Sequence, residues 1–176
     1  VLALAHPREV NRERLLDLLW GDSDRGLARQ SLRQALTTAK RSVGGVLRAD
    51  RDLLSLDMDR CNVDLVAFLE LSNADDIRSL HDAIEHYQGP LLEGLSISED
   101  EFDHWLNVER ARLSKLATET MLRLRDLYLA EGNHAAAVSI LQRLLELDPA
   151  CEEAHRSLMR TFEATGQRSV ALQQYQ

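Results

Sequence analysis

The sequence has little of what builds covalent cross-links, membrane spans or catalytic sites. Its two cysteines, Cys61 and Cys151, form no C-x-x-C pair, which argues against a disulfide framework or a zinc ribbon and favours a reducing, cytoplasmic location. The apolar runs are only a few residues long, and a membrane span needs roughly 20 residues, so we expect no membrane partner. Metalloprotease, hydrolase and phosphate-loop motifs are absent, so we expect no enzyme, metal or cofactor.

Proline is also scarce, with three residues in 176, and strand-like alternation occurs in one place, so we predict a mainly α chain. Charge is unevenly spread: residues 1–60 hold eleven basic and nine acidic residues, whereas residues 61–176 hold ten and twenty. We therefore predict two domains, 1–60 and 63–176, and confine any nucleic-acid contact to the first. The sequence stops at Gln176 within a helical pattern, so we expect a piece of a longer protein.

The pattern of residues 10–43 predicts two helices joined by a short turn. Asn11 is a suitable N-cap, Gly21 is a suitable end for the first helix, and residues 22–24 offer caps for the second. A turn of about four residues is the length that a helix-turn-helix uses. Leu27 does not fit the apolar face, and we expect it at a frayed helix start. The apolar face consists of Ala28, Leu32, Ala35, Leu36, Ala39 and Val43.

Residues 25–49 contain no acid, although six basic residues lie there: Arg25, Arg29, Arg33, Lys40, Arg41 and Arg48. On a helical projection one stripe contains Arg29, Arg33, Thr37 and Lys40, and beside it lie Gln30, Gln34 and Arg41. We expect no carboxylate to neutralise this surface. A run of charge is usually a solvated face. A polyanionic partner is the alternative, and it accounts for six like charges that follow a short turn.

Two further patterns complete the chain. Residues 46–48 and 54–56 flank a turn-prone segment and predict a β-hairpin. The sequence Ser98-x-x-Glu101 is a capping box that opens a long helical pattern. The rest repeats itself with a spacing of 34 residues, the period of tetratricopeptide repeats. The matched pairs are Leu124 and Leu158, Tyr128 and Phe162, Ala130 and Ala164, Gly132 and Gly166, and Ala137 and Ala171, with Pro149 closing the first unit.

In this order, the segments resemble the bacterial antibiotic-regulatory transcription activators, in which a winged helix-turn-helix precedes a bacterial transcriptional activator domain. The segments are RERLLDLLWGD, ARQSLRQAL, the hairpin, VDLVAF, GPLLEGL, FDHWLNVERARL, EGNHAAAVSILQRLLELDP and EEAHRSLMRTFEATGQRSVALQQY. The resemblance covers nearly the whole chain. It implies a recognition helix at 27–43, a wing at 46–57, and tetratricopeptide-like helical repeats at 63–176 that support dimer or RNA polymerase contacts. The family's DNA-binding domain starts with strands and a full first helix, of which only VLALAHP remains.

We therefore expect a transcriptional activator that binds double-stranded DNA. The residues expected to read bases are Arg29, Gln30, Arg33 and Gln34. The residues expected to hold phosphates are Lys40, Arg41, Arg48 and Arg51, and Thr37 completes the expected interface. The related architecture also heads longer chains with ATPase or cyclase domains. The alternative is therefore a helical-repeat interaction or sensory module that regulates another domain without DNA contact.

Overall fold

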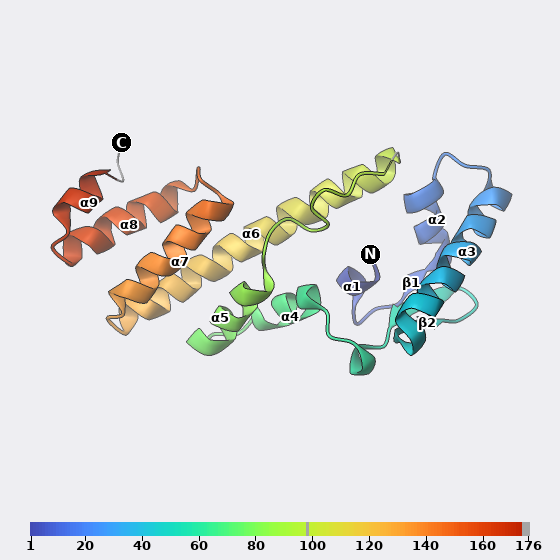
Figure 1. The fold of residues 1–176 in the computed structure, drawn as a ribbon, viewed down its shortest axis with the longest axis horizontal. Helices are drawn as coiled ribbons and strands as arrows, with labels where there is room; N and C mark the ends of the chain where they lie inside the picture. Colours follow the sequence, from blue (N-terminus) through green and yellow to red (C-terminus); the bar gives the residue numbers. More distant parts are fainter. Residues whose placement is uncertain (98, 174–176) are drawn as a thin grey trace. The chain divides into compact units, whose positions relative to one another are not determined.

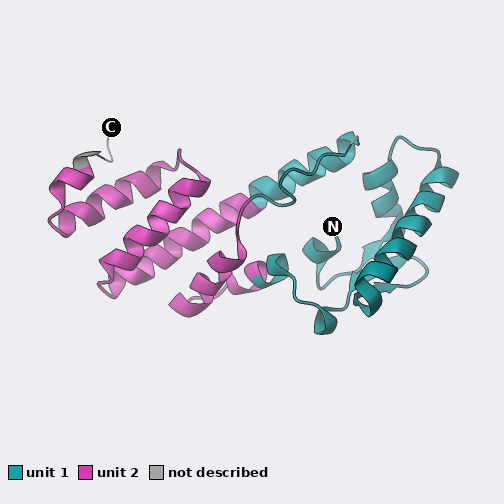
Figure 2. Cartoon of the chain, in the orientation of Figure 1, with its two compact units in different colours: residues 1–67, 90–112 teal, residues 68–89, 113–176 magenta. Residues whose placement is uncertain are grey.

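A computed structural model describes residues 1–97 and 99–173. The chain divides into two compact units (Figure 2), one of residues 1–67 and 90–112, the other of residues 68–89 and 113–176. Each unit is mainly α, as the sequence predicts. The expected boundary between residues 60 and 63 differs from this division, because residues 90–112 belong to the first compact unit.

The first unit contains two helices joined by a turn, together with a small sheet (Figure 1). Its elements are α1 (Leu2–Ala5), β1 (Val10–Asn11), α2 (Arg12–Trp20), α3 (Arg25–Val43), the 3-10 helix η1 (Gly44–Val46), β2 (Leu47–Ala49), β3 (Leu53–Leu56) and the 3-10 helix η2 (Met58–Arg60). Two helices contribute residues to both units, α4 (Asp64–Leu71) and α6 (Asp100–Ala130).

Side-chain caps set the starts of α2 and α3. Asn11 Oδ1 accepts a hydrogen bond of 2.8 Å from the N–H of Glu13. Asp24 Oδ1 accepts from the N–H groups of Gly26, at 2.8 Å, and Leu27, at 3.2 Å. Each cap satisfies donors that lack a partner within the helix. Both caps agree with the sequence, but the expectation of a frayed start at Leu27 was wrong, because Leu27 lies in a capped first turn.

The sheet of the first unit has the order β1-β3-β2 among the described residues, and both of its pairings are antiparallel. Strands β2 and β3 form the expected hairpin, in which Arg48 lies opposite Ser55. Sequence reasoning missed β1, which pairs Val10 with Leu54. Two residues are too few to show alternation.

The helices pack on this sheet through a shared apolar core. The buried residues of the core are Val10, Leu15, Leu16, Ala28, Leu32 and Leu54. The predicted apolar face of α3 is correct in its first half, where Ala28 is 1% and Leu32 is 5% exposed. It is wrong at Ala35 and Val43, whose side chains are exposed. The first half of α3 is therefore anchored to the core, whereas its last residue is not.

The second unit contains α5 (Ile77–His86), the C-terminal part of α6, α7 (His134–Leu147), α8 (Glu152–Ala164) and α9 (Arg168–Gln173). Gly132 and Gly166 have φ of +73° and +75°, a left-handed conformation that favours glycine after a helix. The N–H of Asn133 donates to Tyr128 O, and 34 residues later the N–H of Gln167 donates to Phe162 O, each at 2.8 Å. The expected 34-residue repeat therefore recurs in hydrogen bonding.

Buried side chains and arginines hold the second unit together. Leu124, Ala137 and Leu158 are each at most 1% exposed. Arg123 donates to the carbonyls of Ser72 and Ala74, so it ties the segment that follows α4 to α6. The predicted capping residue Ser98 lies outside the described residues. Among the described helices, none combines the length and the apolar character needed to cross a bilayer.

Candidate nucleic-acid interface

The outer face of α3 is polar and is held in place from below. Ala28 and Leu32 fasten the helix to the core of the first unit, and the exposed side chains on the other faces include Gln30, Arg33 and Gln34. In an α-helix, residues three, four and seven apart share a face. The long side chains of α3 therefore project from a rigid support rather than from a loop.

Two of the six basic residues are paired with acids from α2. Arg29 Nη2 lies 3.0 Å from Glu13 Oε1, and Arg25 Nη2 lies 2.7 Å from Asp17 Oδ1. A second contact of 3.7 Å joins Arg25 to the other oxygen of Glu13. The expectation that no carboxylate neutralises this surface was therefore wrong at Arg29. The acids come from the preceding helix, which crosses the start of α3.

The remaining cations of α3 are exposed and unpaired within the part of the chain that the structure describes. They are Arg33, Lys40 and Arg41. Thr37 is also exposed, and its hydroxyl donates to Arg33 O at 2.8 Å, within the same helix. This bond leaves the lone pairs of the Thr37 oxygen open to an outside donor. The structure thus places Arg33, Thr37, Lys40 and Arg41 on one exposed helix beside Gln30 and Gln34.

In the hairpin, Arg48 is engaged by a buried acid. Arg48 Nη2 lies 2.8 Å from Asp57 Oδ2, and Arg60 Nε lies 3.4 Å from the same oxygen. The side chain of Asp57 is only 8% exposed. The hydrogen bond from Arg48 is the largest cause that holds the pKa of Asp57 below its ordinary value. Arg48 therefore stabilises the base of the hairpin, where it neutralises a carboxylate that has little access to water.

Arg51 differs from Arg48 because it lies in the turn between β2 and β3. Its backbone N–H donates to Asp50 Oδ1 at 2.7 Å, which orders the turn. Its side chain is exposed and has no ion pair among the described residues. Of the two hairpin arginines expected to hold phosphates, Arg51 is thus the one whose guanidinium group is unpaired.

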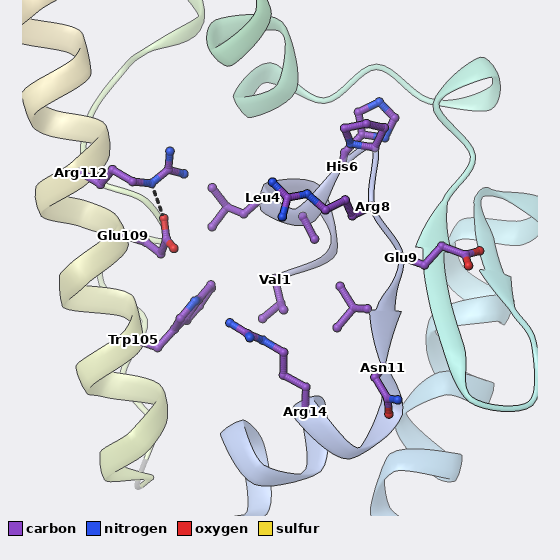
Figure 3. A pocket seen from close by; sticks show the side chains of 13 residues that line it. Val1, Leu4, His6, Arg8, Glu9, Asn11, Arg14, Trp105, Glu109 and Arg112 are labelled. Atoms are coloured by element: carbon purple, nitrogen blue, oxygen red, sulfur yellow. Dashed lines mark hydrogen bonds and ion pairs between the residues drawn. The ribbon is translucent and has the colours of Figure 1, made fainter.

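A cavity of the first unit lies apart from this surface. It has a volume of about 580 Å³ and lies against α1, β1 and the start of α6. Figure 3 shows Arg14 reaching into it opposite Trp105. Glu109 accepts from Arg112 at 2.8 Å at its edge. The lining mixes apolar side chains with arginines and the carboxylates of Glu9 and Glu109, and it includes none of the expected site residues.

Comparison with known families decides the class of this protein. The family model of the bacterial transcriptional activator domain matches residues 63–176. The chain belongs to the bacterial transcriptional activator domain family. Membership assigns it, in general terms, to transcriptional activators, and the family is regulatory rather than enzymatic. No curated protein sequence matches this bacterial transcriptional activator domain protein.

In this family member, sequence reasoning missed the acids that form ion pairs with the arginines of the expected interface. Glu13 and Arg29 are 16 residues apart, and no local spacing rule connects them, because the contact depends on how two helices cross. The residues around Asp57 form an incomplete calcium-loop pattern, which gives no sign of an arginine partner. The pairing of Asp57 with Arg48 follows from the hairpin, since residue 57 comes directly after β3, whose Ser55 lies opposite Arg48.

Proposed function

We propose that this chain is a DNA-binding transcriptional activator. In this proposal residues 1–60 act as a winged helix-turn-helix, with α3 as the recognition helix and the hairpin at 46–57 as the wing. The main support is the outer face of α3, where Arg33, Lys40 and Arg41 are exposed and unpaired, among the described residues, on a helix anchored from below. Proteins that bind DNA combine base-reading side chains on such a helix with flanking cations that hold phosphates.

The proposed contacts fall into two groups with different tasks. Gln30, Arg33 and Gln34 lie in the first half of α3, and their amides and guanidinium group fit the edges of adenine and guanine in the major groove. Lys40, Arg41 and Arg51 lie at the end of α3 and in the hairpin turn, where they fit phosphates on either side. Arg29 and Arg48 belong to neither group, because each forms an ion pair with an acid. The partner of Arg29 is Glu13, and the partner of Arg48 is Asp57.

Fluorescence anisotropy across a salt series tests this division. The duplexes are one sequence that the wild-type chain selects from a random library and a scrambled version of it. Arg33→Ala should cost roughly 1–3 kcal/mol on the selected duplex and relax the preference at one base position. Lys40→Ala should weaken binding to both duplexes alike and reduce the slope of log K against log salt by about one.

Lys115→Ala is the matched control, because it removes one exposed positive charge from α6 in the second unit. It should leave both duplexes bound as tightly as the wild type binds them. If neither Arg33→Ala nor Lys40→Ala changes binding to any duplex, the basic surface of α3 is only a solvated face. The interaction-module function would then replace the DNA-binding function.

For the second unit we propose protein contacts, with RNA polymerase or a second copy of the chain as the partner. A cavity of about 300 Å³ opens there between α6, α8 and the start of α7. Arg125 is 9% exposed at this cavity and pairs with Asp126 and Glu153. The Nδ1 atom of His134 is buried without a hydrogen-bond partner in the described structure. Such a polar hollow on a helical repeat suits a peptide segment better than a metabolite.

A further inference from the structure

Leu27 is the most exposed large hydrophobic residue in the described part of the chain. It is 63% exposed, compared with 52% for Val108 and 47% for Val43. Single exposed leucines are common on protein surfaces, so exposure alone does not indicate a function. Its position does, because Leu27 lies in the first turn of the helix that we propose to enter the major groove.

The backbone at Leu27 is fixed on two sides. Its N–H donates to Asp24 Oδ1 at 3.2 Å, and the next residue, Ala28, is 1% exposed in the core of the first unit. Ala28 N also donates to Asp24 O at 2.8 Å. Because side chains of successive helical residues point about 100° apart, anchoring Ala28 in the core directs Leu27 outward. The apolar side chain is therefore held in a defined place.

The neighbours of Leu27 on the same face include two exposed amides. Gln30 and Gln34 follow it at three and seven residues, a spacing that brings side chains together on one face of a helix. Glutamine bonds to the edge of adenine, and an apolar side chain contacts the methyl group of thymine. The adenine edge and the thymine methyl group are both presented by A·T pairs. The face thus combines the two chemistries that recognise A·T base pairs in the major groove.

We propose that Leu27 is a specificity-determining residue that contacts a thymine methyl group in the target DNA. This inference rests on the proposed DNA-binding function and adds to it a base class and a contact atom. It also explains why an apolar side chain remains exposed within an otherwise polar face. The target sequence then contains thymine opposite the first turn of α3, next to adenines read by Gln30 and Gln34.

Replacement of thymine by uracil tests the proposal, because uracil lacks only the methyl group. The duplex that the wild-type chain selects from a random library is prepared twice, once with thymidine and once with deoxyuridine. Wild-type protein should bind the uracil duplex about fourfold more weakly for each methyl group that Leu27 covers. Leu27→Ala should bind both duplexes with equal affinity, close to that of the wild type on the uracil duplex. Alanine is a strong helix former, so the exposed turn keeps its structure.

Val43→Ala is the matched control, since Val43 is an exposed apolar residue at the other end of the same helix. It should keep the full wild-type difference between the two duplexes. If Leu27→Ala retains that difference, or if the wild type shows none, the role of Leu27 is refuted while DNA binding stands. If the wild type binds no duplex, the proposed function fails first. If sedimentation velocity shows that Leu27→Ala abolishes self-association, Leu27 joins two copies and the inference is overturned.

Discussion

Removal of the negative charge of Glu13, which forms an ion pair with Arg29, should strengthen DNA binding. Glu13 Oε1 lies 3.0 Å from Arg29 Nη2, and the two side chains are 53% and 57% exposed. Glu13→Gln keeps the size of the side chain and removes its charge. Arg25 keeps its closer partner Asp17 at 2.7 Å, so the change mainly frees Arg29. A freed guanidinium group beside Arg33 can then reach DNA without first leaving an ion pair.

The size of the effect follows from the exposure of the pair. An exposed ion pair contributes about 0.2–1 kcal/mol, so Glu13→Gln should tighten binding roughly 1.5- to 5-fold at low salt. On a random-sequence duplex, which offers Arg29 no selected base edge, the freed guanidinium group is one more cation near the phosphates and should steepen the salt slope by about one. The free protein should become less stable by a similar amount, because the variant cannot form the ion pair. The variant also loses the favourable interaction of an acid with the positive end of the α2 dipole, which contributes about 0.3–1 kcal/mol. Affinity and stability should therefore change in opposite directions.

Anisotropy with a fluorescent random-sequence duplex measures the affinity, and urea unfolding measures the stability. Glu146→Gln is the control, because it removes one exposed acid from α7 and changes the net charge equally. It should alter DNA binding far less than Glu13→Gln does. If Glu13→Gln binds DNA no better than Glu146→Gln at any salt concentration, Glu13 does not compete with DNA for Arg29. The argument from ion pairing would then be refuted.

Four further outcomes concern stability. Ala137→Leu should lower the free energy of unfolding by about 1–3 kcal/mol, since Ala137 is fully buried; an unchanged melting temperature contradicts tight packing there. Gly44→Ala should cost about 1–3 kcal/mol by urea unfolding, because Gly44 has φ of +59°. Residues 63–176 alone should melt cooperatively in circular dichroism, and a broad, non-cooperative melt counts against that boundary. Because the pKa of Asp57 is lowered in the folded protein, ionised Asp57 should contribute fully to stability above its pKa in the unfolded chain, about 3.9, and progressively less as the pH falls below that value. Asp57→Asn should flatten this part of the plot of unfolding free energy against pH.

Sequence reasoning succeeded where the determining interactions are local. The caps at Asn11 and Asp24 act on N–H groups two or three residues later, so the residue type and its position are sufficient to predict them. The hairpin is local for the same reason, since its two strands are separated by a short turn. The 34-residue period is visible because Gly132 and Gly166 meet the same backbone requirement.

The parts that sequence reasoning missed depend on contacts between distant segments. Whether Arg29 is available for DNA depends on Glu13, on another helix. Strand β1 exists because Val10 meets Leu54, 44 residues later in the chain. The buried start of α3 was foreseen, but the exposure of Val43 was not, because periodicity does not show how far the supporting core extends.

The matching helix ends at Gly132 and Gly166 bear on how this chain changes in length. Each glycine is followed by a residue whose N–H donates to a carbonyl five positions earlier, in the helix that ends there. Each junction between helices therefore depends only on residues of its own repeat unit. Gain or loss of a whole 34-residue segment preserves every such junction. Loss of a single residue inside α7 or α8 would instead rotate the following helix face by about 100° and move its buried side chains toward water. Viable length variants of this region should therefore differ by complete units, with the glycine at the same place in each.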